Sequence, residues 1–257
     1  MNDEPADGAK SLVRKQFGAN AANYATSKVH AKGASLGRLV ELVSPQPDWR
    51  VLDVATAAGH TAFVMAPHVE HVTATDLTSE MLEVAARLAI EKQITNVDFE
   101  TADAESLPYD DSEFDLVTCR IAPHHFPHPD RFVNEALRVL VSGGRFAMVD
   151  NIVPDDLAVA EFANSWERRR DPSHVRCLSI SEWTALLEQA GFVGITAETA
   201  LKRMDFDTWA DNMNVPADVR IELRHDLVNA SEVVREFLRP EPGAFYLTEG
   251  LFTTQKP

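Results

Sequence analysis

Short apolar, β-prone runs recur along the first 150 positions of the chain, and segments of helical periodicity separate them. In one of these segments Met81, Val84, Ala85 and Leu88 fall on a single helical face. The runs with strand character are 51–54, 71–75, 97–101, 114–119 and 145–150, and the helical segments are 60–67, 79–92 and 129–140. Because strands alternate with helices, the pattern predicts a mostly parallel sheet covered on both faces.

The pattern changes after residue 150. Helical segments become longer, and two further strand-like runs bracket the last of them. Helices are expected at 155–170, 179–190 and 205–239, and strands at 195–202 and 244–254.

The N-terminal region has a different character. Residues 1–9 are acidic and contain Pro and Gly, which predicts a disordered leader. Residues 11–43 are helical, with a break expected at 17–24, where Gly18 and two asparagines are poor helix formers. We therefore expect a single domain over 10–257, in which lid or substrate-pocket elements are formed by 10–45, 155–175 and 205–239.

Composition narrows the classes of partner. The 257 residues carry a formal net charge of −16, which disfavours binding to nucleic acid and to anionic membrane surfaces. Cys119 and Cys177 lie far apart in the sequence, so a disulfide framework is not expected. The acidic N-terminus has no apolar core of a signal peptide, and a cytoplasmic protein is expected. The oligomeric state is left open, and a homodimer is compatible with the sequence.

Chemistry-bearing residues follow the predicted strands. In open α/β sheets, ligands bind beyond the carboxyl ends of the strands. Asp53, Asp76 and Asp103 end or follow the first three strands, and Arg120 ends the fourth, just before two adjacent histidines. Asp76 lies 17 residues past Gly59, close to where a dinucleotide fold places its ribose-binding acid. The alternative is a helix cap or a surface carboxylate.

Four motifs in this order carry a family resemblance: VLDVATAAGHTA, ATDLTSEMLEVA, TADAESLPYDDSEFDLVTCRIAPHHF and LRVLVSGGRFAMVD. The order resembles the class I S-adenosylmethionine-dependent methyltransferases. Within them it is similar to the branch of the quinone-biosynthesis C-methyltransferases and many small-molecule methyltransferases. The resemblance covers about 10–155, and the segments RRRDPSHVR and LSISEWTALLEQAGF extend it to about 195.

The resemblance implies a seven-stranded, doubly wound Rossmann-like α/β sheet with its last strand antiparallel and a helical lid. It also implies S-adenosylmethionine as the cofactor. By this resemblance the loop 53–59 packs against the methionine moiety, and Arg120 lies beside the sulfonium. Asp76 binds the ribose, Leu77 and Met81 flank the adenine, and Asp103 and Ala104 meet the edge of the adenine. Tyr24 closes over the cofactor.

The loop after the first strand departs from the family pattern. The family has an acid followed by alternate glycines, whereas this chain has Ala55 and Ala57 and retains only Gly59. S-adenosylmethionine has no pyrophosphate, so the loop need not wrap phosphate oxygens. If position 57 requires a positive φ, its methyl group costs about 1 kcal/mol or more, and cofactor binding is expected to be either weakened or lost.

The expected activity is transfer of a methyl group from S-adenosylmethionine to carbon, oxygen or nitrogen of a small organic acceptor, by in-line displacement. His124 and His125 are the candidate general bases, because the loop after the fourth strand faces the methyl group. The alternative is that they pack within the loop. A metal site of His124, His125, His128 and Asp130 is disfavoured, because no cysteine pair accompanies it and residues 128–130 are typical of a helix start.

Candidate acceptor-binding residues lie in the second half of the chain. His174 and Arg176 belong to its densest charged cluster, and Trp209 lies in the late helical segment. Two other functions stay open. One is a non-catalytic protein that binds S-adenosylmethionine, and the other is a methyltransferase fold recruited for non-methyl chemistry.

Overall fold

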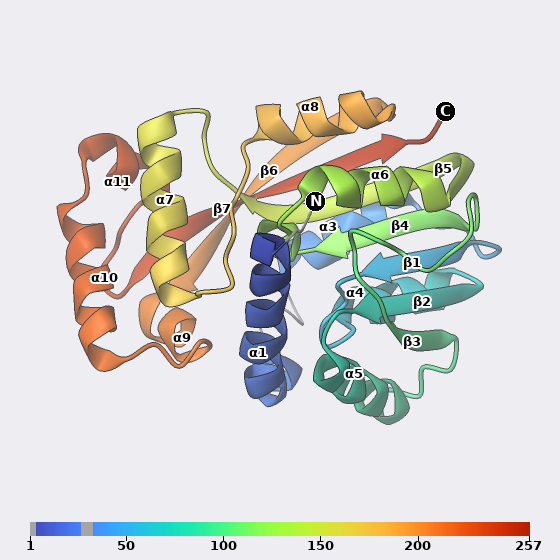
Figure 1. The fold of residues 1–257 in the computed structure, drawn as a ribbon, viewed down its shortest axis with the longest axis horizontal. Helices are drawn as coiled ribbons and strands as arrows, with labels where there is room; N and C mark the ends of the chain where they lie inside the picture. The colour runs from blue at the N-terminus through green and yellow to red at the C-terminus, as the bar shows by residue number, and fades with distance from the viewer. Residues whose placement is uncertain (1–3, 27–32) are drawn as a thin grey trace.

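A seven-stranded sheet forms the centre of the molecule (Figure 1). The computed structural model describes residues 4–26 and 33–257. The strands are β1 (Arg50–Val54), β2 (His71–Asp76), β3 (Val97–Thr101), β4 (Phe114–Arg120), β5 (Leu140–Ile152), β6 (Val193–Asp205) and β7 (Ala244–Gln255). Their order is β3-β2-β1-β4-β5-β7-β6. The five strands β3, β2, β1, β4 and β5 are parallel to one another. β7 runs antiparallel to both β5 and β6, as the resemblance implied.

Helices cover both faces of this sheet (Figure 1). The helices on one face are α3 (Ala34–Val43), α4 (His60–Met65) and α5 (Ser79–Glu91), and those on the other are α6 (Pro129–Val139) and α8 (Ile180–Ala190). β1 shows why both faces are needed, because its successive side chains point in opposite directions. Val51 packs in a buried cluster with Leu39 of α3, whereas Leu52 packs in a second cluster with Phe132 of α6.

A helical cluster lies beside one end of the sheet, at the left of Figure 1. It consists of α7 (Leu157–Arg170), α9 (Phe206–Asp211), α10 (Ala217–Asn229) and α11 (Glu232–Leu238). The paired strands β6 and β7 reach into it, and Phe245 of β7 meets Trp166 of α7 at a ring distance of 4.9 Å. Trp166 also stacks on Trp209 at 4.4 Å. The helical cluster therefore has an aromatic core of its own.

The helix α1 (Glu4–Thr26) passes between the helical cluster and the parallel strands (Figure 1). Residues 4–9, expected as a leader, lie within this helix, and it continues through 17–24 without the expected break. Packing explains the difference, because tertiary contacts outweigh weak helix propensity. Ala6 is buried, and the ring of Phe17 meets the edge of His125 at 5.0 Å. None of the described helices has the length and apolar character that crossing a membrane requires.

Candidate active site

A cavity opens at the carboxyl ends of β1 to β4, and the empty space within it and at its mouth amounts to about 1420 Å³. One wall, the sheet half, is formed by 55–58, Thr61, Asp76, Leu77, 102–105 and Arg120. The opposite wall, the helical half, is formed by Glu167, Arg170, Asp171, Lys202, Met204, Trp209, Asn212, Met213 and Leu247.

The carboxylate of Asp53 is buried under the loop that follows β1. Among the described residues, it is not one that lines the cavity. It is 1% exposed and accepts hydrogen bonds from the hydroxyl groups of Thr56 and Thr118, the second at 2.7 Å. Burial raises the pKa of Asp53 to about 6, although the two hydroxyl groups lower it. Asp53 therefore holds the loop against β4 through these two hydrogen bonds.

The loop itself has the backbone of a glycine-rich turn. Ala55 has a φ of +54° and Ala57 a φ of +50°, in the left-handed region that L-residues rarely adopt. Gly59 has a φ of +83°, and a Cβ atom there would lie 2.6 Å from the ring of Phe63. Position 59 thus favours glycine, whereas the two alanines hold strained conformations and are among the residues that line the cavity.

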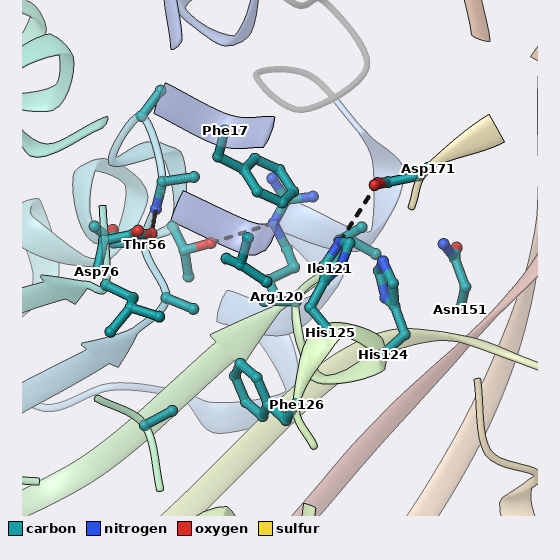
Figure 2. Close-up of a pocket in the computed structure, with 18 of the residues that line it drawn as sticks. Phe17, Thr56, Asp76, Arg120, Ile121, His124, His125, Phe126, Asn151 and Asp171 are labelled. Carbon is teal, nitrogen blue, oxygen red and sulfur yellow. Dashed lines mark hydrogen bonds and ion pairs between the residues drawn. The ribbon is translucent and has the colours of Figure 1, made fainter. Parts of the chain in front are cut away.

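Asp76 ends β2 and joins the loop to the next helix (Figure 2). Its carboxylate accepts the N–H of Ala57 and the N–H of Thr78, both at 2.9 Å. Burial raises the pKa of Asp76, against the lowering effect of these two bonds. Leu77 lies beside it on the wall. Met81, expected to flank the adenine, is instead fully buried in the core shared with the helical cluster.

Asp103 and Ala104 reach the cavity from the turn after β3, as expected. A residue not singled out from the sequence meets them there. The ammonium group of Lys10, on α1, lies 2.7 Å from Asp103 Oδ2 and 2.6 Å from Glu105 Oε2. The helix α1 is thereby tied to the sheet half. The side chain of Tyr24, the other residue expected from this helix, lies outside the described part of the chain.

Arg120 and Ile121 form the end of β4 (Figure 2). The guanidinium of Arg120 donates to the hydroxyl of Thr61 at 3.2 Å, and burial lowers its pKa. Ile121 has a φ of +54°, a conformation that is a genuine outlier for a β-branched residue. Its N–H donates to the carbonyl of Val149 at 2.7 Å, which holds the strained turn in place. The turn redirects the chain so that the next residues line the cavity.

His124 and His125 lie where the two halves meet, and both line the cavity (Figure 2). Their ring centroids are 4.2 Å apart. His124 Nδ1 lies 2.6 Å from Asp150 Oδ1, and His125 Nδ1 lies 3.0 Å from the carbonyl oxygen of Ser173. In the described part of the chain, no three His, Cys, Asp or Glu side chains are arranged to hold a metal ion.

Backbone groups of the segment 171–176 hold this histidine pair by hydrogen bonds. The N–H groups of Val175 and Arg176 both donate to the carbonyl of His124, at 2.9 and 3.0 Å. Ser173 donates its N–H and its hydroxyl to Asp171 Oδ1, at 3.0 and 2.6 Å. The segment 171–176 therefore positions the histidines through its backbone.

The candidate acceptor-binding residues have different positions. Trp209 lines the helical half. His174 is buried behind the wall and bonds Asn164 Oδ1 at 2.9 Å, and burial strongly lowers its pKa. The side chain of Arg176 points outward, half exposed, and pairs with Glu182. Only Trp209 of the three therefore contributes its side chain to the cavity wall.

Sequence reasoning missed several residues of this site. Asp150 could have been found, because it lies near the carboxyl end of β5, as the other candidates lie at the ends of their strands. Asp171 belongs to a motif that had been singled out. Lys10, Glu167 and Lys202 could not be found in this way, because a charged residue in a predicted helix or strand is usually solvent-exposed. In the folded chain Lys202 pairs with buried Glu249 at 3.0 Å.

Comparisons with known proteins agree with this architecture. The sequence profile of a family described as a methyltransferase domain matches residues 45–191. The uncharacterized methyltransferase YcgJ of Bacillus subtilis is 39% identical over 220 residues, which are 86% of this chain and 87% of the relative. The ubiquinone/menaquinone biosynthesis C-methyltransferase UbiE of Brucella canis is 40% identical over 111 residues, 42% of this chain and 41% of the relative.

Solved structures extend the agreement to the fold. The crystal structure of YcgJ from Bacillus subtilis superposes with a TM-score of 0.83 at 37% identity, over 86% of this chain and 97% of that one. A candidate methyltransferase of Bacillus halodurans gives the same TM-score and identity over 88% of this chain and 100% of that one. With its sheet order, its strand-end loops and these relatives, the chain belongs to the class I S-adenosylmethionine-dependent methyltransferases.

Proposed function

We propose that this methyltransferase moves a methyl group from S-adenosylmethionine to a carbon, oxygen or nitrogen atom of a small organic acceptor. The observation that carries the proposal is the position of the histidine pair. His124 and His125 lie between a wall of strand-end loops and a wall of buried charged and aromatic side chains. A cofactor on one wall and an acceptor on the other would meet at these imidazoles.

The sheet half fits the cofactor. Each oxygen of Asp76 accepts one backbone N–H, and a carboxylate oxygen has a second lone pair for a ribose hydroxyl. Leu77 would cover the adenine, Asp103 and Ala104 would meet its edge, and Arg120 would lie beside the methionine moiety. When bound, S-adenosylmethionine supplies a methyl group on a positively charged sulfur, which is a reactive electrophile.

The residues of this chain then have to align the acceptor, exclude water and accept a proton. The helix α1 closes the cavity from outside, with Phe17 against His125 and Lys10 on the acids after β3. Trp209 offers an apolar surface in the helical half. An imidazole at position 124 or 125 would take the proton of an acceptor that binds in its protonated form.

The alanine loop supports a second candidate, a protein that binds S-adenosylmethionine without catalysis. The methyl groups of Ala55 and Ala57 line the wall where the family has glycine, so they reduce the room for the methionine moiety. A third candidate is non-methyl chemistry on the same fold, because a fold does not by itself determine a reaction. A non-catalytic protein should bind S-adenosylmethionine but methylate no acceptor in a panel, whereas a methyltransferase should do both.

The test is calorimetric titration of the protein with S-adenosylmethionine and S-adenosylhomocysteine. We expect micromolar binding that weakens by roughly 10²–10³-fold in Asp76→Ala, because two hydrogen bonds to a charged group are lost. Glu83→Ala is the matched control, an exposed acid on α5 that should bind like the wild type. Absence of binding by the wild type to both ligands would overturn the proposal. Activity in Ala57→Gly with none in the native chain would favour the second candidate.

A further inference from the structure

We propose that Asp150 is a positioning residue that makes His124 the proton acceptor of the reaction, while neighbouring His125 stays neutral. The two adjacent histidines therefore have different tasks, and the site is built for an acceptor that arrives with its proton in place. This inference rests on the proposed methyl transfer and assigns roles within the same site.

The contact between His124 and Asp150 determines which nitrogen can act. Asp150 lies at the end of β5 with no exposed surface, and its Oδ1 is 2.6 Å from His124 Nδ1. An ionised carboxylate only accepts hydrogen bonds, so Nδ1 carries the proton and Nε2 of the neutral ring has the lone pair. The same carboxylate stabilises the imidazolium that forms when Nε2 takes a proton.

His125 is held differently. Its Nδ1 donates to the backbone carbonyl of Ser173, a neutral group. The nearest carboxylate is Asp171, 4.0 Å from Nε2, and its Oδ1 atom already accepts two bonds from Ser173. A charge on His125 would lie beside a charged His124, with ring centroids 4.2 Å apart. Only one of the two rings is therefore suited to carry the proton.

The surroundings of His124 agree with this division. Asp150 faces it from β5, Glu167 from α7 and Asp171 from the turn after α7, and its ring neighbours are His125 and His174. Burial lowers the pKa of His124, but the three carboxylates, Asp150 first, raise it above the ordinary value. For His125, burial and then the charge on His124 lower the pKa to about 4, although Asp171 and the carbonyl of Ser173 act in the opposite direction.

The proton and the electrons balance in the following way. The acceptor atom forms its new bond to the methyl carbon as the carbon–sulfur bond breaks, and that bonding pair stays on sulfur. The proton of the acceptor moves to Nε2 of His124, and the imidazolium remains bonded to Asp150. After product release this proton passes to solvent, and His124 is neutral again.

A first test needs no knowledge of the acceptor. The imidazole C–H signals of the S-adenosylhomocysteine complex are followed by NMR across pH in the wild type, in Asp150→Asn and in the control Asp155→Asn, which changes an exposed acid. We expect His124 to titrate above 6.5 in the wild type and in the control, and below 6.5 in Asp150→Asn. Titration of wild-type His124 at or below 6.5 overturns the proposal even if the variant fails to fold. Unchanged titration in a folded variant does so as well.

A second test uses 4-nitrophenol as the acceptor probe, because its phenolate absorbs visible light and its phenol does not. The probe is added to the S-adenosylhomocysteine complex one pH unit below its own pKa. We expect the bound probe to ionise in the wild type and to lose this ionisation about tenfold in His124→Asn and Asp150→Asn. His125→Asn should weaken binding but leave the bound probe ionised. Ionisation that survives in His124→Asn, or no binding at millimolar probe, overturns the assignment.

The two proposals fail separately. If the protein binds neither S-adenosylmethionine nor S-adenosylhomocysteine, the proposed function fails. If it binds both, and Asp76→Ala abolishes the binding while Asp150→Asn leaves the NMR titration and the probe spectrum unchanged, only the role of Asp150 fails.

Discussion

The two walls of the cavity are built by different means. In the sheet half, short loops follow consecutive parallel strands, and backbone N–H groups bond a buried acid, as Ala57 and Thr78 do with Asp76. In the helical half, the wall comes from residues 167–247 on helices and on extended strands, and its charges are paired side chains such as Lys202 with Glu249. Topology fixes the first wall, and tertiary packing fixes the second.

This difference has an energetic side. In the sheet half, β1 and β4 each pair with a strand on both sides, so the sheet buffers a local change. The helical cluster packs around a core of its own, in which Trp166 stacks on Trp209. The wall proposed to bind the acceptor therefore depends on side-chain packing rather than on a strand ladder.

The largest expected effect comes from Trp209→Ala. Trp209 is 1% exposed and meets Trp166, Phe206 and Phe245 within 5.4 Å. Its truncation should lower the free energy of unfolding by about 3–5 kcal/mol, because a large cavity opens in the aromatic core. Urea unfolding gives the value, and hydrogen exchange should rise mainly in α7 and α9–α11. Equal exchange increases in β1–β4 would show that the two regions form one cooperative unit.

The second effect is a pH dependence. The pKa of His125 is lowered to about 4 in the folded chain, so the unfolded chain binds a proton that the folded chain does not between about pH 6.5 and 4. Stability from this group is therefore present above that window and lost as the pH falls through it, by about 1 kcal/mol per pH unit. We expect His125→Asn to have a flatter curve of unfolding free energy against pH. A curve parallel to that of the wild type would contradict the buried neutral state.

A third experiment tests the ion pairs that Lys10 of α1 makes with the acids after β3. Lys10→Met leaves Glu105, whose side chain is 3% exposed, without its cation, and should destabilise the protein by about 1–2 kcal/mol. Lys15→Met, at an exposed position on the same helix, is the matched control and should change little. Thermal unfolding and limited proteolysis within α1 report the effect. Equal behaviour of the two variants would mean that the ion pair does not hold the helix.

The smallest effect has the opposite sign. Ala57→Gly removes a methyl group from a residue with a φ of +50° and should stabilise the protein by about 0.5–1 kcal/mol. Ala58→Gly is the control in the same loop. It is not among the residues with a positive φ, so it should destabilise the protein. A loss of stability in both variants would show that Ala57 is not strained.

Sequence reasoning reached the sheet half because its signals are local. Asp76, Asp103 and Arg120 follow strands that the hydrophobic pattern predicts, and the topology of a parallel sheet brings strand ends together. The same reasoning anticipated the cost of a positive φ at Ala57. It could not decide which way a side chain points within a strand or helix. Asp53 and Met81, expected beside the cofactor, are therefore found behind the wall.

The helical half was out of reach for a physical reason. Its wall joins residues that lie far apart in the sequence, and no periodicity records which of them meet. The segment RRRDPSHVR was visible, but the position of His124 depends on bonds from its Val175 and Arg176 to a carbonyl about fifty positions earlier. Lys10, Glu167 and Lys202 became site residues only through folding. The pairing of a histidine with Asp150 required the register of β4 against β5.

The position of β7 has a consequence for how the molecule is made. This strand comes last in the chain, yet it lies inside the sheet, between β5 and β6. On the ribosome β6 is synthesised before the strand that joins it to the rest, so it must wait for Ala244–Gln255 to emerge. The sheet half can assemble early in translation, and the helical half is anchored at the end. Loss of the last strand would split the sheet rather than trim its edge.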